Sequence, residues 1–303
     1  MPPAGAEGRW RSPLVAAWEA FGRYDTYDGV EVFTLDLPPV GPAAHEPLLV
    51  LHGFPTCSFD FHLVVERLRS RRRVLMVDFL GYGLSAKPDR PYTMGLQADL
   101  TARFVASTGV TELSLLSHDM GDTVGGELLA RQLEGTWPVE VVRRVVTNGS
   151  VYIEMAHLSP GQELLLSLPD ERLGPEAPID ETTLTASLRA TFSPTSTVDA
   201  EELAALWELV SHDDGHLLLA RLIRYIEERR QHQSRFTGAI EEHPSPLAVV
   251  WGSEDPIAVR QMAERLHGVR PDAPLRLLDG VGHYPMVESP DAFVAAVLAG
   301  LDG

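Results

Sequence analysis

The chain has 303 residues, 44% of them hydrophobic, and 25 basic against 43 acidic side chains give a net charge of −18. The composition is ordinary for a soluble globular protein, and the negative charge argues against nucleic acid or an anionic membrane as a partner. Cys57 is the only cysteine, which excludes a disulfide within the chain. Without an apolar signal segment or a run near the roughly 18 residues of a membrane span, we expect a cytoplasmic protein.

The N-terminal half alternates strand-like and helix-like segments. We expect a disordered tail over residues 1–13, and the alternation of residues 24–37 around Asp28-Gly29 predicts a two-stranded hairpin. Short apolar runs follow, with helical patterns between them. These runs cover residues 46–53, 72–83 and 112–119, and the helical patterns cover residues 59–70 and 93–108. Apolar strands that alternate with helices are typical of a parallel sheet covered on both faces.

A fourth apolar strand ends near Ser150, and the alternation stops there. Residues 151–238 contain only helical patterns and loops divided by prolines, whereas strands resume at residues 245–256 and 273–285 before a final helix. We therefore predict one α/β domain with a mostly parallel sheet, formed by residues 14–150 and 239–303. The helical segment 151–238 is expected to be a cap inserted into it.

Reactive side chains stand directly after strands of this sheet, where ligands bind in such folds. Asp119 follows a strand in "LLSHDMGD", Asp255 lies in "GSEDP" and His283 in "GHYP". Any one of them could be a helix cap or a turn residue, but their joint placement favours a catalytic set. Ser117 and Gly121 flank Asp119 as small residues flank the nucleophile of the α/β-hydrolase fold, and the order nucleophile, acid, histidine is that of the fold.

These motifs resemble those of the α/β-hydrolases with an aspartate nucleophile, which include soluble epoxide hydrolases, haloalkane dehalogenases and fluoroacetate dehalogenases. The sequence is similar in particular to the group of the mesoderm-specific transcript protein and its bacterial relatives. The resemblance runs from about Trp18 to the C-terminus. It is carried, in order, by "LLVLHGFPT", "DFLGYGLSAKP", "LLSHDMGD", "ELW…DDG", "RYIEERRQHQSRF", "GSEDP" and "GHYP".

An aspartate at this turn can attack without a base, because its side chain is anionic at neutral pH. The Asp119 carboxylate would displace a halide or open an epoxide at carbon and form an alkyl ester. Water activated by His283, which Asp255 orients, would then hydrolyse the ester. By position, the main-chain N–H groups of Phe54 and Met120 would form the oxyanion hole.

Ser117 is the alternative nucleophile, and it would make the protein an esterase. This reading is disfavoured because it puts Leu115 and Asp119 where the sharp turn needs small residues.

The leaving group separates the related families. Haloalkane dehalogenases bind halide through a tryptophan after the nucleophile and often an asparagine after the "HG", where this chain has Met120 and Phe54. Neither side chain carries an N–H group, and Trp207 of the insertion is left as one candidate donor. Fluoroacetate dehalogenases carry an arginine where this chain has Met120. Soluble epoxide hydrolases protonate the leaving oxygen with cap tyrosines, for which Tyr225 and Tyr152 are the candidates.

We therefore expect an epoxide hydrolase that forms a vicinal diol. A haloalkane dehalogenase is the alternative, and an esterase-like or non-enzymatic binding protein on the same scaffold is the next. The sequence contains no HExxH, Walker or GxGxxG motif, so we expect no metal or organic cofactor. The expected partner is a small apolar substrate, and a homodimer is left open.

Overall fold

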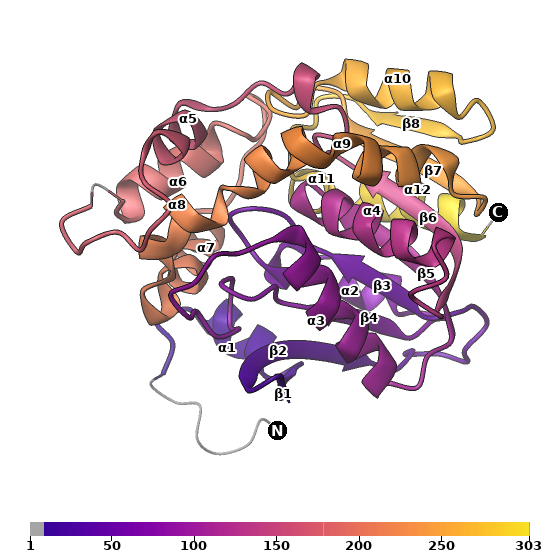
Figure 1. Ribbon diagram of the computed structural model, residues 1–303, viewed down its shortest axis with the longest axis horizontal. Helices are drawn as coiled ribbons and strands as arrows, with labels where there is room; N and C mark the ends of the chain where they lie inside the picture. Colours follow the sequence, from indigo (N-terminus) through magenta and orange to yellow (C-terminus); the bar gives the residue numbers. More distant parts are fainter. Residues whose placement is uncertain (1–8, 178, 303) are drawn as a thin grey trace.

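In the computed structural model, which describes residues 9–177 and 179–302, the strands form one eight-stranded sheet in the order β1-β2-β4-β3-β5-β6-β7-β8 (Figure 1). The strands are β1 (Arg23–Tyr27), β2 (Val30–Leu37), β3 (Leu48–Leu51), β4 (Val74–Val77), β5 (Glu112–His118), β6 (Glu140–Thr147), β7 (Leu247–Gly252) and β8 (Leu275–Leu278). β2 pairs antiparallel with β1 and β4, and the other neighbours are parallel. The predicted α/β-hydrolase sheet is confirmed.

The predicted hairpin and apolar strands form where expected. Asp28 and Gly29 have φ angles of 52° and 78°, the left-handed values that a tight two-residue hairpin turn requires. Every residue of β3 and β4 is buried, because these central strands have helices on both faces.

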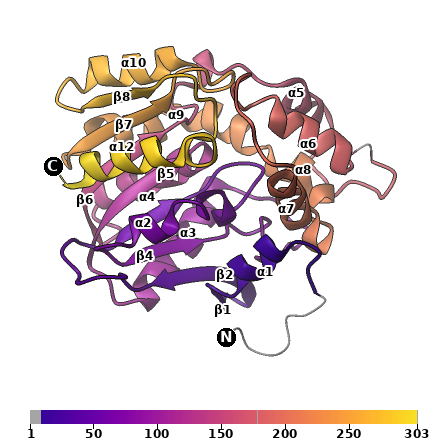
Figure 2. The same cartoon turned by 180° about the vertical axis from the view of Figure 1, so that it is seen from behind.

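Helices cover both faces of the sheet. α3 (Met94–Ser107), α4 (Met120–Leu133) and α9 (Tyr225–Glu242) lie on the face toward the viewer in Figure 1, and α2 (Val65–Leu68) and α12 (Pro290–Asp302) lie on the face seen in Figure 2. α10 (Arg260–Val269) packs against β7 and β8, and α11 (Pro285–Glu288) leads into α12. Within the described part of the chain, none of the helices has the length and apolarity that a membrane crossing requires.

After β6 the chain leaves the sheet and builds the helical region at the left of Figure 1. Its helices are α5 (Pro160–Ser167), α6 (Glu181–Arg189), α7 (Ala200–Ser211) and α8 (Leu219–Leu222), with short 3₁₀ turns at Ile153–Met155 and His212–Leu218. α9 then runs from this region back along α4, with a local break at His232, so the expected cap boundary at residue 238 falls inside one helix.

Two segments differ in detail from the sequence expectation. Only a 3₁₀ turn (Ser58–Phe61) and α2 form within residues 59–70, where one longer helix was expected; neither start has a side-chain cap to satisfy its free N–H groups. Of the expected tail, residues 1–8 lie outside the described residues. The main-chain N–H groups of Arg11 and Ser12 donate to Glu208 of α7, and α1 (Pro13–Glu19) begins directly after them.

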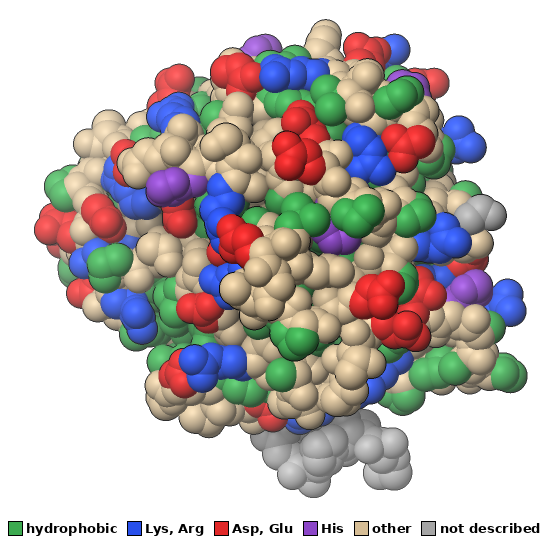
Figure 3. Space-filling view, turned by 45° about the vertical axis from the view of Figure 1, so that its right-hand side comes forward, with side chains coloured by type: hydrophobic (Ala, Val, Ile, Leu, Met, Phe, Trp, Pro, Cys, Tyr) green, Lys and Arg blue, Asp and Glu red, His purple; other side chains and the backbone are tan. Residues whose placement is uncertain are grey.

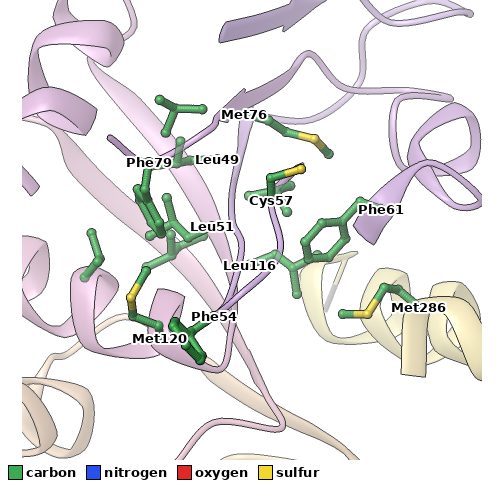
Figure 4. Packing of buried hydrophobic residues seen from close by; sticks show 14 of the residues in the cluster. Leu49, Leu51, Phe54, Cys57, Phe61, Met76, Phe79, Leu116, Met120 and Met286 are labelled. Atoms are coloured by element: carbon green, nitrogen blue, oxygen red, sulfur yellow. The ribbon is translucent and has the colours of Figure 1, made fainter. Parts of the chain in front are cut away.

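The apolar core extends from the sheet to the turns that carry the reactive residues. Figure 4 shows Leu49 and Leu51 of β3 and Leu116 of β5 within this cluster, with Phe54 and Met120 at one end of it. Both end residues are buried, so close packing holds the two turns rigidly. On the face shown in Figure 3, acidic and basic side chains are interspersed rather than gathered into one charged area.

Candidate active site

Asp119 sits in a strained turn between β5 and α4. Its φ of 50° and ψ of −115° are unusual for a residue with a side chain. The turn depends on glycines: a Cβ at Gly121 would lie 2.5 Å from the Leu51 carbonyl oxygen, and one at Gly53 would lie 2.7 Å from the Asp119 Cβ. The sharp turn that the small flanking residues predict is therefore present, and Asp119 occupies its centre.

Main-chain donors surround this carboxylate. The Phe54 N–H donates to Asp119 Oδ2 at 2.9 Å. Met120 is the first residue of α4, so its N–H belongs to the helix N-terminus beside Asp119, where helix dipoles favour negative charge. The two residues expected to form the oxyanion hole therefore both adjoin Asp119.

His283 and Asp255 lie together as the sequence predicts. Asp255 Oδ2 is 2.7 Å from His283 Nδ1, and both side chains are buried. The second oxygen, Oδ1, accepts the main-chain N–H groups of Ile257 and Ala258, so the carboxylate cannot rotate freely. The arrangement leaves Nε2 of His283 as the nitrogen that can serve as a base.

Nearby charges set the protonation of His283. Burial lowers its pKa, but the charge and hydrogen bond of Asp255 and the charge of Asp119 outweigh burial and raise the pKa to about 9. The imidazole is therefore an imidazolium at neutral pH.

His118 contacts the main chain of His283. Its Nε2 lies 2.8 Å from the main-chain oxygen of His283, and the two rings are 5.0 Å apart. Burial and the neighbouring His283 lower the pKa of His118 to about 4. His118 is thus a neutral donor that fixes the loop of His283.

Tyr225 reaches the site from the start of α9. It is buried, and its ring centroid lies 5.7 Å from that of Phe54, whose N–H holds Asp119. Burial and the charge of Asp119 raise the pKa of Tyr225 well above its ordinary value, so its hydroxyl keeps its proton.

Tyr152 and Trp207 lie elsewhere. The Tyr152 hydroxyl donates to Glu241 at 2.7 Å, and the Arg265 guanidinium stacks on its ring at 3.9 Å. Trp207 of α7 borders a separate cavity beside Arg11. Neither residue lines the cavity at His283. Tyr225 does not line it either, but Tyr225 packs on Phe54, which does.

An apolar cavity of about 90 Å³ opens onto His283 between the core and the cap. Its lining residues are Phe54, Pro55, Ile257, His283 and Tyr284 of the core with Ser159, Gly161, Gln162, Leu164, Leu165, Ile179, Thr183, Leu184, Ser187, Leu188, Thr191 and Leu219 of the cap. Apart from His283 this lining contains no ionisable group except the Tyr284 phenol, so the cavity suits an uncharged, apolar molecule.

Three residues that contact the site were not among the site residues predicted from the sequence. Asn148 donates to Asp255 Oδ2 at 2.8 Å, and the Tyr82 hydroxyl lies 3.3 Å from the Met120 sulfur. Arg229 donates from Nη2 to the main-chain oxygen of Asp119 at 3.2 Å. Asn148 directly follows a strand, which was a usable signal, whereas the roles of the other two depend on packing between distant segments.

Ser117 lies in β5 rather than at the centre of the turn. Its hydroxyl is buried and donates to Asp122, which gives it a structural role beneath Asp119. Among the residues with described positions, no group of three or more histidine, cysteine or acidic side chains is arranged to hold a metal ion.

Comparison with known proteins places the chain in a family. The model of the alpha/beta hydrolase family matches residues 48–296. The putative hydrolase LipZ of Mycobacterium tuberculosis is 40% identical over 292 residues, which are 95% of this chain and 98% of that protein. The mesoderm-specific transcript protein of Mus musculus is 31% identical over 300 residues, 95% of this chain and 88% of that protein.

A haloalkane dehalogenase of Agrobacterium fabrum is 29% identical over 150 residues, which cover 50% of this chain and 47% of that protein. The extent of the family match, the two full-length relatives and the turn around Asp119 agree: the chain is a hydrolase-fold protein that belongs to the alpha/beta hydrolase family.

Proposed function

We propose that the protein is an epoxide hydrolase that works through an alkyl ester on Asp119. The carboxylate attacks one carbon of the epoxide, the carbon–oxygen bond of the ring breaks, and Tyr225 gives its proton to the leaving oxygen. Water then attacks the ester carbonyl with His283 as base, and the acyl–oxygen bond breaks to release a vicinal diol.

The electrostatics support this order of events. Part of the raised pKa of His283 comes from the charge of Asp119, and esterification removes that charge. The pKa of His283 then falls, so the imidazolium can return a proton to the Tyr225 phenolate that ring opening has produced. Neutral His283 can next accept a proton from water, so the charges balance over the cycle.

The observation that carries the choice of an epoxide is the position of Tyr225. It is a buried phenol beside Phe54 and Asp119, and no hydrogen bond of its hydroxyl is found among the described residues. A free phenol suits an alkoxide leaving group, which must be protonated. Met120 and Phe54 offer no side-chain N–H for a halide. The apolar cavity supports a small apolar substrate. We propose that the protein acts in the cytoplasm.

Single turnover in heavy-oxygen water tests the mechanism. With excess enzyme and styrene oxide, the first diol should carry an unlabelled oxygen from Asp119, and the label should enter that side chain. Asp119→Asn should form neither ester nor diol, and Ser117→Ala serves as the matched control at the same turn. Diol formation without label in Asp119 would rule out the covalent mechanism.

A haloalkane dehalogenase is the second candidate, because the Agrobacterium fabrum protein of that name is 29% identical over 50% of this chain. Dehalogenation would use the same attack by Asp119, with a halide as the leaving group in place of the epoxide oxygen. Clear halide release from bromoalkanes, with no turnover of epoxides, would favour it.

A further inference from the structure

Two side chains of α9 lie near the turn of Asp119: Arg229 binds its main-chain oxygen, and Tyr225 packs on Phe54, whose N–H binds its carboxylate. Tyr225 and Arg229 stand one helical turn apart, and the guanidinium carbon of Arg229 lies 5.1 Å from the Tyr225 ring centroid. The same guanidinium donates from Nε to Thr123 Oγ1 at 2.7 Å and from Nη2 to the main-chain oxygen of Asp119 at 3.2 Å. Arg229 therefore touches the phenol, the turn of Asp119 and the first turn of α4 together.

On the basis of the proposed function, we propose that Arg229 is a positioning residue for ring opening, which fixes the Tyr225 phenol relative to the Asp119 carboxylate. The guanidinium is planar and rigid, so its two hydrogen bonds set its orientation and its stacking sets that of the ring. Arg229 is only 2% exposed, which shields these contacts from bulk solvent.

The charge of Arg229 also acts on the phenol. No carboxylate forms an ion pair with it within the described ranges, and its Nη1 has no hydrogen-bond partner there. Oδ2 of Asp122 also has no hydrogen-bond partner within the described ranges. Arg229 and Asp122 both line a cavity of about 10 Å³, which is near the size of one water molecule.

This positive charge acts on Tyr225 and also on Asp122, whose pKa burial raises and Arg229 lowers. Although burial raises the pKa of Tyr225, the charge of Arg229 lowers it, which stabilises the phenolate left after proton transfer.

Arg235 provides a matched control on the same helix. It also fastens α9 to α4, through Glu127 at 2.6 Å and Glu134 at 2.5 Å, but these contacts lie away from Tyr225 and Asp119. Figure 1 shows α9 alongside α4. Loss of Arg235 should weaken helix packing without moving the phenol.

The experiment is a double-mutant cycle on the opening step. In a His283→Gln parent, which should hold the alkyl-enzyme, the rate of adduct formation with excess styrene oxide is followed by intact-protein mass. The variants are Tyr225→Phe, Arg229→Met, both together, and Arg235→Met, each checked for folding by circular dichroism.

We expect Arg229→Met to slow adduct formation about tenfold or more, because a correctly placed general acid contributes about 10²–10⁴ in rate. The substrate concentration that gives half of the maximal rate should not change. In the Tyr225→Phe background the same change should cost less than about threefold, since both residues act through one proton. Arg235→Met should stay within about twofold of the parent. Arg229→Lys keeps the charge but lacks the planar fork, and should fall between parent and Arg229→Met.

Fully additive losses, or an equal loss in Arg235→Met, would overturn the positioning role. If Arg229→Met does not fold, a fully active Arg229→Lys would overturn it as well. A parent that forms no adduct at all, with Arg229 and Tyr225 intact, would instead overturn the proposed function.

Discussion

The main-chain N–H of Phe54 donates to Oδ2 of Asp119 at 2.9 Å, so one donor of the expected oxyanion hole already binds the resting carboxylate. This contact distinguishes the two oxygens of Asp119. In the proposed mechanism Oδ2 would become the ester carbonyl and then the oxyanion. Oδ1, for which no hydrogen bond is found among the described residues, would attack carbon. Binding Oδ2 in advance means that no reorganisation is needed when charge returns to it.

Tyr225→Phe should slow formation of the alkyl-enzyme from an epoxide by about 10²-fold, because the leaving oxygen loses its proton donor. Tyr152→Phe should leave this rate unchanged, since the Tyr152 hydroxyl donates to Glu241 instead. Stopped-flow or quenched single-turnover measurements with styrene oxide compare the two. An equal loss in both variants would contradict the assignment of Tyr225.

The pKa of His283 should depend on the charge of Asp119. Nuclear magnetic resonance titration of the ring should give about 9 in the native protein and a lower value in Asp119→Asn. An unchanged pKa in Asp119→Asn would show that the carboxylate does not act on the imidazole. Glu288→Gln is a comparison variant that removes a weaker charge contribution and should lower the pKa less.

The same shift has a consequence for folding stability. The folded-state pKa of His283 is raised above the unfolded value of about 6.5, so protonation stabilises the fold fully below about pH 6.5. This contribution is lost as the pH rises through about 9. In urea unfolding, the loss of unfolding free energy caused by His283→Gln should therefore be larger at pH 6 than at pH 10. A larger loss at pH 10 would contradict the raised pKa of His283.

Asn148 should matter for the second half of the reaction. Its amide donates to Asp255 Oδ2, and its carbonyl oxygen accepts the Gly252 N–H at 2.9 Å, so it holds the acid in place for His283. Asn148→Gly tolerates the φ of 45° while removing the side chain. Ester hydrolysis should slow about tenfold or more, so that the alkyl-enzyme accumulates, while its formation changes little. Equal slowing of both steps would count against this role.

The close approach of α4 to β3 should be sensitive to one methyl group. Gly121→Ala places a Cβ 2.5 Å from the rigid Leu51 carbonyl oxygen, and we expect it to cost about 1–3 kcal/mol of unfolding free energy. Gly238→Ala in α9 meets no atom within 4 Å and should instead stabilise the protein by about 0.5–1 kcal/mol. Thermal unfolding followed by circular dichroism separates the two; a neutral Gly121→Ala would show that the turn can relax.

The sheet and the order of the site residues could be predicted from local features of the sequence. Apolar runs, the Asp28-Gly29 turn and the small residues around Asp119 are local signals, and each acts through backbone conformation or burial within a few residues. They led to the confirmed fold and to the prediction that Asp119, Asp255 and His283 meet at one edge of the sheet.

Which cap residues lie near that edge depends on packing between distant segments, and this could not be predicted from the sequence. Tyr225 and Tyr152 are both candidates in the sequence, with Tyr225 favoured by its motif, and in the structure Tyr225 packs on Phe54 whereas Tyr152 binds Glu241. The same is true of Arg229 and Arg235, two arginines of one helix with different partners on α4. The direction of the α9 side chains depends on how this helix packs along α4. That packing arises from contacts between residues more than one hundred positions apart, which no local pattern encodes.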